Sequence, residues 1–216
     1  LTEEGYLGAL IPEAFGGLGL PLSAGAAILE EIHRSGGNAG ACHAQMYTMG
    51  TVLRHGTEAQ KASFLPGIAR GELRLQAFGV TEPSSGTDTS ALRTTARRQG
   101  DFYIVNGQKI WTSAGHLANY IFVLARTSPD DVKHRGITFL LVDMRQKGVE
   151  VRPIKMMSGD SEFNEVFFTD VRVPKHQIVG ARGEGWAVAN AILGHERDSL
   201  GNPNNTLLRL NALIEL

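Results

Sequence analysis

The segment "FYIVNGQKIWTS", residues 102–113, has the clearest β-strand pattern in this chain. Apolar and polar side chains alternate on either side of Asn106-Gly107, and a period of two is typical of β-strands. An Asn-Gly pair between such runs is the strongest short-range signal for a two-residue hairpin turn. The segment therefore predicts two antiparallel strands, Phe102–Val105 and Gln108–Thr112, joined at residues 106–107.

Other strand patterns surround this segment. Residues 92–98 form a strand pattern before it. The continuous apolar runs "YIFVLART" (residues 120–127) and "GITFLLVD" (residues 136–143) predict strands that are buried on both faces. "VEVRPI" (residues 149–154) and "NEVFFTDVRVP" (residues 164–174) bring the total to about seven strands. Short strands at this spacing favour an antiparallel β-sandwich or barrel.

Helical periodicity lies on both sides of the strands. We expect a helix that Ser23 caps and that continues through Arg34, and a second helix over residues 42–55. Thr57 and Gln60 form a capping box that should begin a third, short helix, which Pro66 ends. "GEGWAVANAILGHERDSLG" predicts another helix after the strands. The expected fold class is α+β: an N-terminal helical segment (1–75), a central antiparallel β-sandwich or barrel domain (76–180) and the start of a C-terminal helical bundle (181–216). Because the chain starts without Met and "NALIEL" stops inside an apolar helical pattern, we expect both helical parts to be incomplete.

Composition narrows the class of protein. The 216 residues are 42% hydrophobic and 20% charged, as in an ordinary globular protein. The net charge is −1 and acidic and basic residues are interspersed, so no basic patch predicts nucleic-acid binding. No apolar run approaches the length of a membrane span, and the N-terminus lacks a secretion signal. The lone cysteine, Cys42, indicates a reducing compartment, and the histidines form no cluster that predicts a metal site.

The loop "GVTEPSSGTDTS", residues 79–90, carries a hydroxyl on six of its twelve residues. Such a density of donors suits an anionic ligand or one that is rich in hydrogen-bonding groups. A strand tryptophan such as Trp111 is by itself most often a core residue. Next to Thr112, Ser113 and the hydroxyl-rich loop, however, it can form an apolar wall edged by donors, which a stacked heteroaromatic cofactor requires.

Two further motifs have competing interpretations. "GARGEGW", residues 180–186, lacks the glycine spacing of a dinucleotide site, and we interpret it as a structural loop. Glu196 and Arg197 form either a solvated charge pair or part of a site. Since Glu196 follows Leu193 by three residues, it can face the core, where burial raises the pKa of a glutamate and suits it to act as a base. The sequence leaves both interpretations open.

Taken together, these segments resemble the acyl-CoA dehydrogenase family of flavoenzymes. "GVTEPSSGTDTSA" resembles the family's V-T-E-x-x-x-G-[ST]-D segment, and "KIWTSAG" resembles its K-x-W-I-T-N-[AG] segment. "IPEAFGGLG", "TEAQKASFLPGIARGE", "FNEVFFTDVRVPKHQIVG" and "GEGWAVANAILGHER" are similar to other family segments in the same order. The resemblance covers nearly the whole chain and implies N-terminal helices, a middle β-domain and a C-terminal helical bundle.

The resemblance implies an FAD cofactor held against the β-domain. Thr81 would bond the pyrimidine edge of the isoalloxazine ring, Ser113 would lie near its N5 atom, and Trp111 would shield one face. Gly86 and Thr87 would approach the pyrophosphate, and Thr87 and Arg197 would contact the acyl-CoA substrate. The complete set of implied ring contacts is Phe78, Val80, Thr81, Trp111, Thr112 and Ser113.

The implied reaction is α,β-dehydrogenation of an acyl-CoA thioester, with electrons passed to an electron-transfer flavoprotein. Glu196 is a candidate base, although most members carry the base in the C-terminal bundle. The chain departs from the family at Ser113 and Ala114, where threonine and asparagine are usual. The resemblance also implies a homo-oligomer, a dimer or tetramer, in a bacterial cytoplasm or a mitochondrial matrix.

Three alternatives stay open alongside that reaction: an acyl-CoA oxidase, a flavin monooxygenase of the same fold, or a catalytically inactive FAD-binding homologue. A β-sandwich binding module would explain the strands, but not the two hydroxyl-rich motifs.

Overall fold

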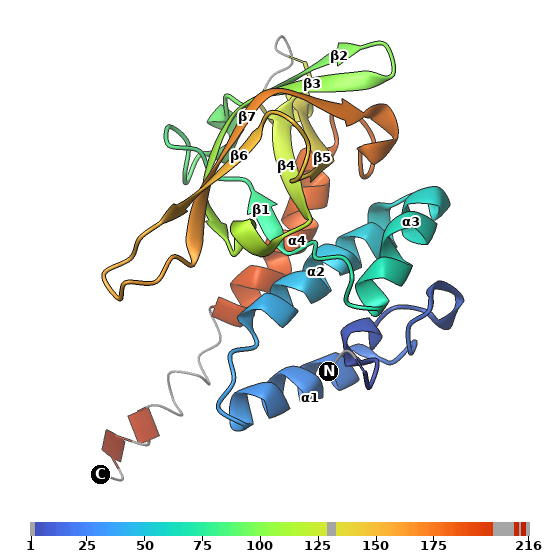
Figure 1. Cartoon of the computed structure of the whole chain (residues 1–216), viewed down its shortest axis with the longest axis vertical. Helices are drawn as coiled ribbons and strands as arrows, with labels where there is room; N and C mark the ends of the chain where they lie inside the picture. Colours follow the sequence, from blue (N-terminus) through green and yellow to red (C-terminus); the bar gives the residue numbers. More distant parts are fainter. Residues whose placement is uncertain (1–2, 129–132, 201–209, 212, 215–216) are drawn as a thin grey trace.

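The computed structural model of the chain describes residues 3–128, 133–200, 210–211 and 213–214, without the side chains of residues 41 and 195–200. A β-sheet domain stands on a group of helices, and the last long helix runs from the sheet to those helices (Figure 1). The expected α+β class is confirmed. No helix of the described ranges is long and apolar enough to cross a membrane.

Three helices precede the sheet: α1 (Leu22–Arg34), α2 (Gly40–His55) and α3 (Glu58–Ala69). The capping box at α3 is confirmed, because the Thr57 hydroxyl accepts from the Gln60 amide at 3.2 Å and the Gln60 side chain accepts from the Thr57 amide at 2.8 Å. The predicted stop at Pro66 is wrong, since the helix continues to Ala69. Ser23 is not the cap of α1, which begins at Leu22 after Pro21. Short 3₁₀ turns cover Tyr6–Gly8, Glu13–Phe15, Thr89–Ala91, Gly115–Leu117 (η4), Lys133–Gly136 and Lys175–Gln177.

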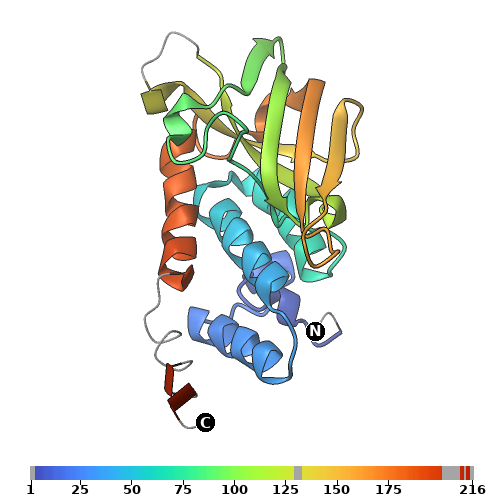
Figure 2. The same cartoon turned by 90° about the vertical axis from the view of Figure 1, so that its left-hand side faces the viewer.

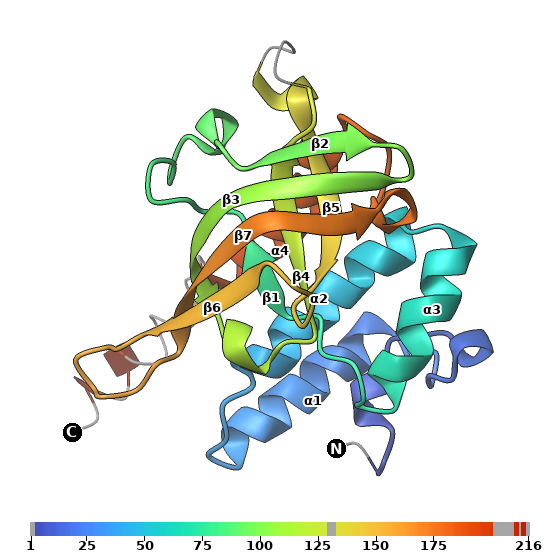
Figure 3. The same cartoon turned by 45° about the horizontal axis from the view of Figure 1, so that its top comes forward.

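Seven strands form one bent sheet with the order β1-β4-β2-β3-β7-β6, and β5 pairs with β4. Most neighbours are antiparallel, but β4 pairs in parallel with β1 and, at one point, with β2, so the sheet is mixed. Figure 3 shows β2, β3, β7 and β6 in a front layer, with β4 and β5 behind them. The strands are β1 (Ala77–Gly79), β2 (Thr95–Gln99), β3 (Phe102–Ser113), β4 (Tyr120–Arg126), β5 (Ile137–Asp143), β6 (Val149–Ile154) and β7 (Phe163–Pro174).

The hairpin predicted at Asn106-Gly107 is wrong, because residues 102–113 form the single strand β3 along β7. At this point the pairing shifts register, as at a β-bulge, and Gly107 has a φ of 151°. A Cβ at Gly107 would lie 2.5 Å from the Thr94 hydroxyl, so close approach to the residue just before β2 accounts for the glycine. Asn106 exchanges hydrogen bonds of 3.0 and 2.9 Å with Asp170 of β7. The Asn-Gly pair thus bends a long strand instead of ending it.

The strands β4 and β5 are buried on both faces, as their apolar runs predict. Alternate side chains of each strand enter two different cores. On β4, Ile121 and Val123 pack between the two sheet layers, whereas Phe122 and Leu124 pack against the helices. These two strands therefore join the β-domain to the helical segment.

Helix α4 (Gly185–Leu200) packs on β5 and α2. Its first residue lies so close to the sheet that a Cβ on Gly185 would be 2.4 Å from the Phe139 amide nitrogen. The amide of Gly183 donates to the Thr138 hydroxyl at 2.9 Å. Residues 180–186 thus pack a helix end against a strand, and Figure 2 shows α4 extending beside α2 from there.

Candidate functional site

A cavity of about 600 Å³ lies where the loop after β1 and the end of β3 meet α2 and α4. This volume falls within the usual range for small-ligand sites. Five of the predicted cofactor residues line it: Phe78, Val80, Thr81, Trp111 and Ser113. The remaining lining residues are Asn38, Gly40, Ala44, Tyr47, Gln76, Ile110, Ala114, Glu162 and Leu193.

Hydrogen bonds hold the two hydroxyl-bearing segments together. The Ile110 amide donates to the Thr81 carbonyl at 3.0 Å, and the Thr112 hydroxyl donates to the Phe78 carbonyl at 2.7 Å. Thr112 is completely buried and does not line the cavity. Its neighbours Trp111 and Ser113 line the cavity. The Thr112 side chain points away from the cavity and holds this part of β3 against β1.

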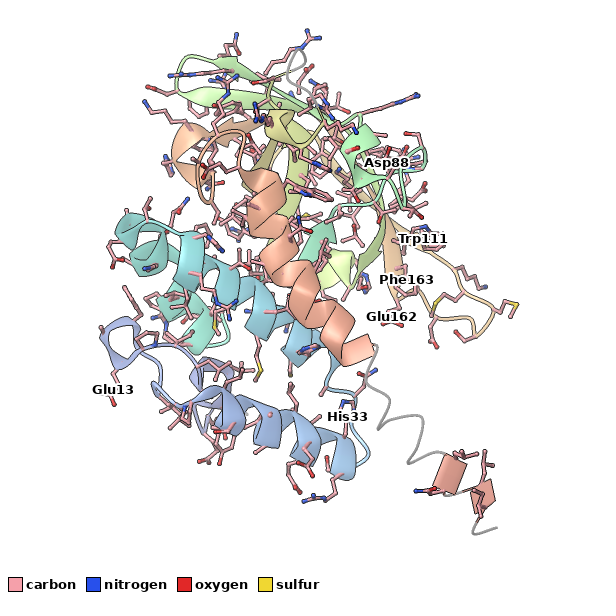
Figure 4. The ribbon with its side chains drawn as sticks, turned by 180° about the vertical axis from the view of Figure 1, so that it is seen from behind. Glu13, His33, Asp88, Trp111, Glu162 and Phe163 are labelled. Carbon is pink, nitrogen blue, oxygen red and sulfur yellow. The ribbon has the colours of Figure 1, made fainter. Side chains whose placement is uncertain are left out.

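Trp111 is not a core residue, since 56% of its surface is exposed. It lies at a second register shift, between Lys109 and Thr112, and its φ is +63°. Left-handed backbone costs roughly 1–2 kcal/mol in a residue other than glycine, and such strain gathers at functional sites. The indole meets the Phe163 ring edge-on at 6.0 Å, and Figure 4 shows both residues near Glu162.

A buried ion pair fixes the loop that follows β1. The Glu82 carboxylate accepts from the Lys109 ammonium at 2.9 Å and from the amides of Arg93 and Thr94 at 2.6 and 2.9 Å. The Lys109 ammonium also donates to the Val80 carbonyl at 3.1 Å. One carboxylate thus ties together both ends of the 82–93 loop and β3.

Burial and charge have opposing effects on this pair. Burial lowers the pKa of Lys109 to about 8, although Glu82 counteracts it. Burial favours a raised pKa for Glu82, but the charge of Lys109 and several hydrogen bonds outweigh burial and leave that pKa below its ordinary value. Both groups are therefore charged at neutral pH. This pair was not predicted from the sequence, although Lys109 lies an even number of positions from the apolar residues Tyr103 and Val105, which are buried in the same strand.

Some hydroxyl groups of the 79–90 loop form hydrogen bonds within the loop itself. The Ser85 hydroxyl donates to the Asp88 carbonyl at 2.6 Å, and the Ser90 hydroxyl bonds the Asp88 carboxylate. Gly86 and Thr87 are exposed and lie outside the cavity lining. Thr81 is the loop hydroxyl that faces the cavity.

The helices supply the opposite wall, which the sequence analysis did not foresee. Tyr47 of α2 packs edge-on against Phe78 at 5.0 Å, and Leu193 of α4 lines the cavity. No local motif predicts such contacts, because they depend on how α2 and α4 pack on the sheet. The side chains of Glu196 and Arg197 lie outside the described residues.

Comparison with known families agrees with this geometry. The family models of the acyl-CoA dehydrogenase N-terminal and middle domains match residues 1–72 and 77–171. The chain belongs to the acyl-CoA dehydrogenase family. Both matched regions contribute to the cavity, since Tyr47 lies in the first and Thr81 and Trp111 lie in the second.

Relatives within the acyl-CoA dehydrogenase family include proteins of different names. Acyl-CoA dehydrogenase FadE29 from Mycobacterium tuberculosis is 43% identical over 93% of this chain and 51% of its own length. The solved structure of the Tcur3481–Tcur3483 steroid ACAD has a TM-score of 0.84 and 34% identity, over 97% of this chain and 54% of its own. The prolyl acyl carrier protein oxidase AnaB has a TM-score of 0.83 and 30% identity, over 91% and 53%. The chain thus spans about half the length of these relatives.

Proposed function

We propose that this chain is the FAD-binding part of an acyl-CoA dehydrogenase. One observation carries the proposal: the loop after β1 and the bulged end of β3 line a single cavity. With Phe78 of β1, their residues Val80 and Trp111 provide an apolar wall, and Thr81 and Ser113 provide two hydroxyls at its edge. A flat heteroaromatic ring with a polar rim fits such a donor set.

Each residue in this proposal has a specific role toward FAD. Thr81 and Ser113 would hydrogen-bond the polar edge of the ring system, and Trp111 would cover one face. Thr112 holds this wall by its bond to the Phe78 carbonyl. Gly86 and Thr87, which are exposed in the loop, would approach the pyrophosphate. When bound, FAD supplies the acceptor for the β-hydrogen and its electron pair.

The chain must also bind and activate the substrate. In the proposed reaction a carboxylate removes the α-proton of an acyl-CoA thioester, and Glu196 is our candidate for that base. Leu193, three residues before Glu196 in the sequence, lines the cavity, which supports a position of this part of α4 near the substrate. Thr87 and Arg197 are proposed to contact the acyl-CoA. The apolar side chains of the cavity, including Tyr47, would keep water away from the reacting carbons.

The experiment is an anaerobic titration of the full-length purified protein. The proposal expects a yellow protein whose flavin absorbance bleaches when an acyl-CoA is added. Glu196→Gln should retain the yellow colour but lose the bleaching if Glu196 is the base. A protein that takes up no FAD would overturn the proposal, whereas bound FAD without response to any acyl-CoA would favour an inactive homologue.

The cavity wall on α2 supports a bulky acyl group. Gly40 and Ala44 present little or no side chain to the cavity, and one structural relative is named a steroid ACAD. We infer that a polycyclic acyl-CoA bleaches the flavin at lower concentration than a straight-chain acyl-CoA. The same titration tests this preference, and a reversed order of the two substrates would contradict it.

Similarity to AnaB, which is named an oxidase, supports a second candidate function. An acyl-CoA oxidase would consume oxygen during turnover without another electron acceptor, whereas the proposed dehydrogenase needs an electron-transfer flavoprotein. Family membership also supports a homo-oligomer, a dimer or tetramer, and a location in a bacterial cytoplasm or a mitochondrial matrix. Measurement of oxygen uptake with and without the electron-transfer flavoprotein separates the two functions.

A further inference from the structure

A buried amide lies behind the wall that carries Trp111. Asn164, near the start of β7, has no exposed surface. Its side-chain nitrogen donates to the Thr112 carbonyl at 3.0 Å and to the Glu162 carbonyl at 3.4 Å, and its oxygen lies 3.2 Å from Nδ1 of His116. The partners thus lie on β3, in the residue just before β7 and in the η4 turn, so the side chain of Asn164 joins three segments around the cavity wall.

Residues 111–114, at the end of β3, include two residues with strained backbone. Contacts from other segments must stabilise their conformation. Trp111 and Ala114, three residues apart, both have left-handed backbone, with φ values of +63° and +48°. An asparagine or aspartate in this conformation can form a local side-chain hydrogen bond, but tryptophan's bulk and alanine's methyl group give no such help. The surrounding structure must therefore determine this conformation.

The contacts that hold residues 111–114 come mainly from Glu162, Phe163 and Asn164, at the start of β7 and just before it. The Ala114 amide donates to the Glu162 carbonyl at 2.7 Å, and Asn164 bonds the Thr112 carbonyl between the two strained residues. Phe163, the residue between Glu162 and Asn164, meets the indole of Trp111. Consecutive strand residues point to opposite faces. On one face of β7, Phe163 therefore contacts the indole of Trp111. On the other face, Asn164 holds the backbone of the same segment through the Thr112 carbonyl.

We propose that Asn164 is a positioning residue that fixes the backbone of residues 111–114 and thereby keeps Trp111 and Ser113 in the cavity wall. Its effect on FAD rests on the proposed function, but its effect on Trp111 does not. Loss of its amide leaves a buried carbonyl without this donor, so the strained segment relaxes and the indole changes its surroundings.

The test uses the fluorescence of Trp111 in the protein without cofactor. The chain has two tryptophans, so Trp186→Phe leaves Trp111 as the reporter within these 216 residues. Asn164→Ala and the isosteric Asn164→Asp, each in this background, should shift the emission maximum and change quenching by acrylamide. They should also raise the FAD dissociation constant by roughly tenfold, as expected for one lost hydrogen bond to a buried group.

Asn106→Ala is the matched control. Asn106 also bridges β3 and β7 at a bulge, through Asp170, but it is not among the residues that line the cavity. This variant should keep the Trp111 emission and the FAD affinity of the reference protein, so a general loss of β3–β7 stability cannot mimic the expected result.

Three results would overturn the proposal. The first is a folded Asn164 variant whose Trp111 emission and FAD affinity match those of the reference. The second is Asn106→Ala changing both readouts as much as Asn164→Ala. The third is failure of both Asn164 variants to fold, since Asn164 would then be a general core residue. If the unmodified protein takes up no FAD, the proposed function fails, but the emission readout still decides the role of Asn164.

Discussion

Lys109 and Glu82 form a buried ion pair that holds the loop after β1 against β3. Removal of one partner from a buried ion pair leaves the other charge unpaired and typically costs about 3–5 kcal/mol. We expect Lys109→Met to lower the free energy of unfolding by about this amount in urea titrations. The double variant Glu82→Gln/Lys109→Met should lose less than the sum of the two single losses. Strictly additive losses would contradict a coupled pair.

A control for this cycle is the exposed pair formed by Arg70 and Glu72 at 2.8 Å. Both side chains are largely in solvent, where ion pairs contribute little to stability. Arg70→Met should therefore leave the unfolding midpoint close to that of the unmodified protein. A loss equal to that of Lys109→Met would mean that burial of the Lys109 pair has no special importance.

The same pair predicts a pH dependence relative to the double variant. The pKa of Lys109 is lowered from 10.5 to about 8 in the folded protein, so between these values only the unfolded chain keeps the proton. The relative stability of the unmodified protein therefore rises with pH in this window. The pKa of Glu82 is also lowered, so its contribution is present above the unfolded pKa near 4.5 and disappears as acid protonates the folded carboxylate. Unfolding free energies measured at several pH values test both signs, and a fall between pH 8 and 10 would contradict the first.

The residues of the two motifs could be predicted from sequence as parts of the site. The buried residues that hold these motifs in place by hydrogen bonds and charge could not. Thr81, Trp111 and Ser113 belong to segments with a distinctive composition, and the cavity contains all three. Asn164 lies 52 positions from the Thr112 carbonyl that it bonds, and Glu82 lies 27 positions from Lys109. Such pairings depend on the register of neighbouring strands, which composition alone does not specify.

At the scale of elements, the two glycines of α4 should respond to alanine in opposite directions. A Cβ on Gly185 would collide with the backbone of β5, whereas a Cβ on Gly194 meets nothing within 4 Å. Gly185→Ala should therefore destabilise the protein, and Gly194→Ala should stabilise it by roughly 0.5–1 kcal/mol through helix propensity. Thermal unfolding of both variants measures the difference. Equal shifts of the same sign would contradict the close packing of α4 on β5.

Local sequence patterns predicted secondary structure correctly where a segment had a single clear pattern. Examples are the capping box at the start of α3 and the apolar runs of β4 and β5. The predicted hairpin failed because an Asn-Gly pair serves equally well at a bulge. β3 has the 12-residue partner β7, and continued pairing outweighs a turn after four residues. The parallel pairing of β1 with β4 likewise joins residues 44 positions apart, such as Ala77 and Ile121, and has no local signature.

At the scale of the whole molecule, β4 and β5 connect the sheet domain to the helices by contributing to both cores. This shared core explains how α2 and α4 come to lie opposite the loop after β1 and complete the cavity. The order of helices, strands and helix could be predicted from periodicity, and the family model matches cover residues 1–72 and 77–171. The two domain boundaries proposed from sequence, after residues 75 and 180, stay predictions.

The most direct measurement is a crystal structure of the full-length protein with FAD. We predict that the ring system lies in the cavity between the loop after β1 and the end of β3. Its polar edge should be within hydrogen-bonding distance of Thr81 and Ser113, and one face should lie against Trp111. A ring system bound elsewhere, with packed side chains between these two segments, would contradict the account.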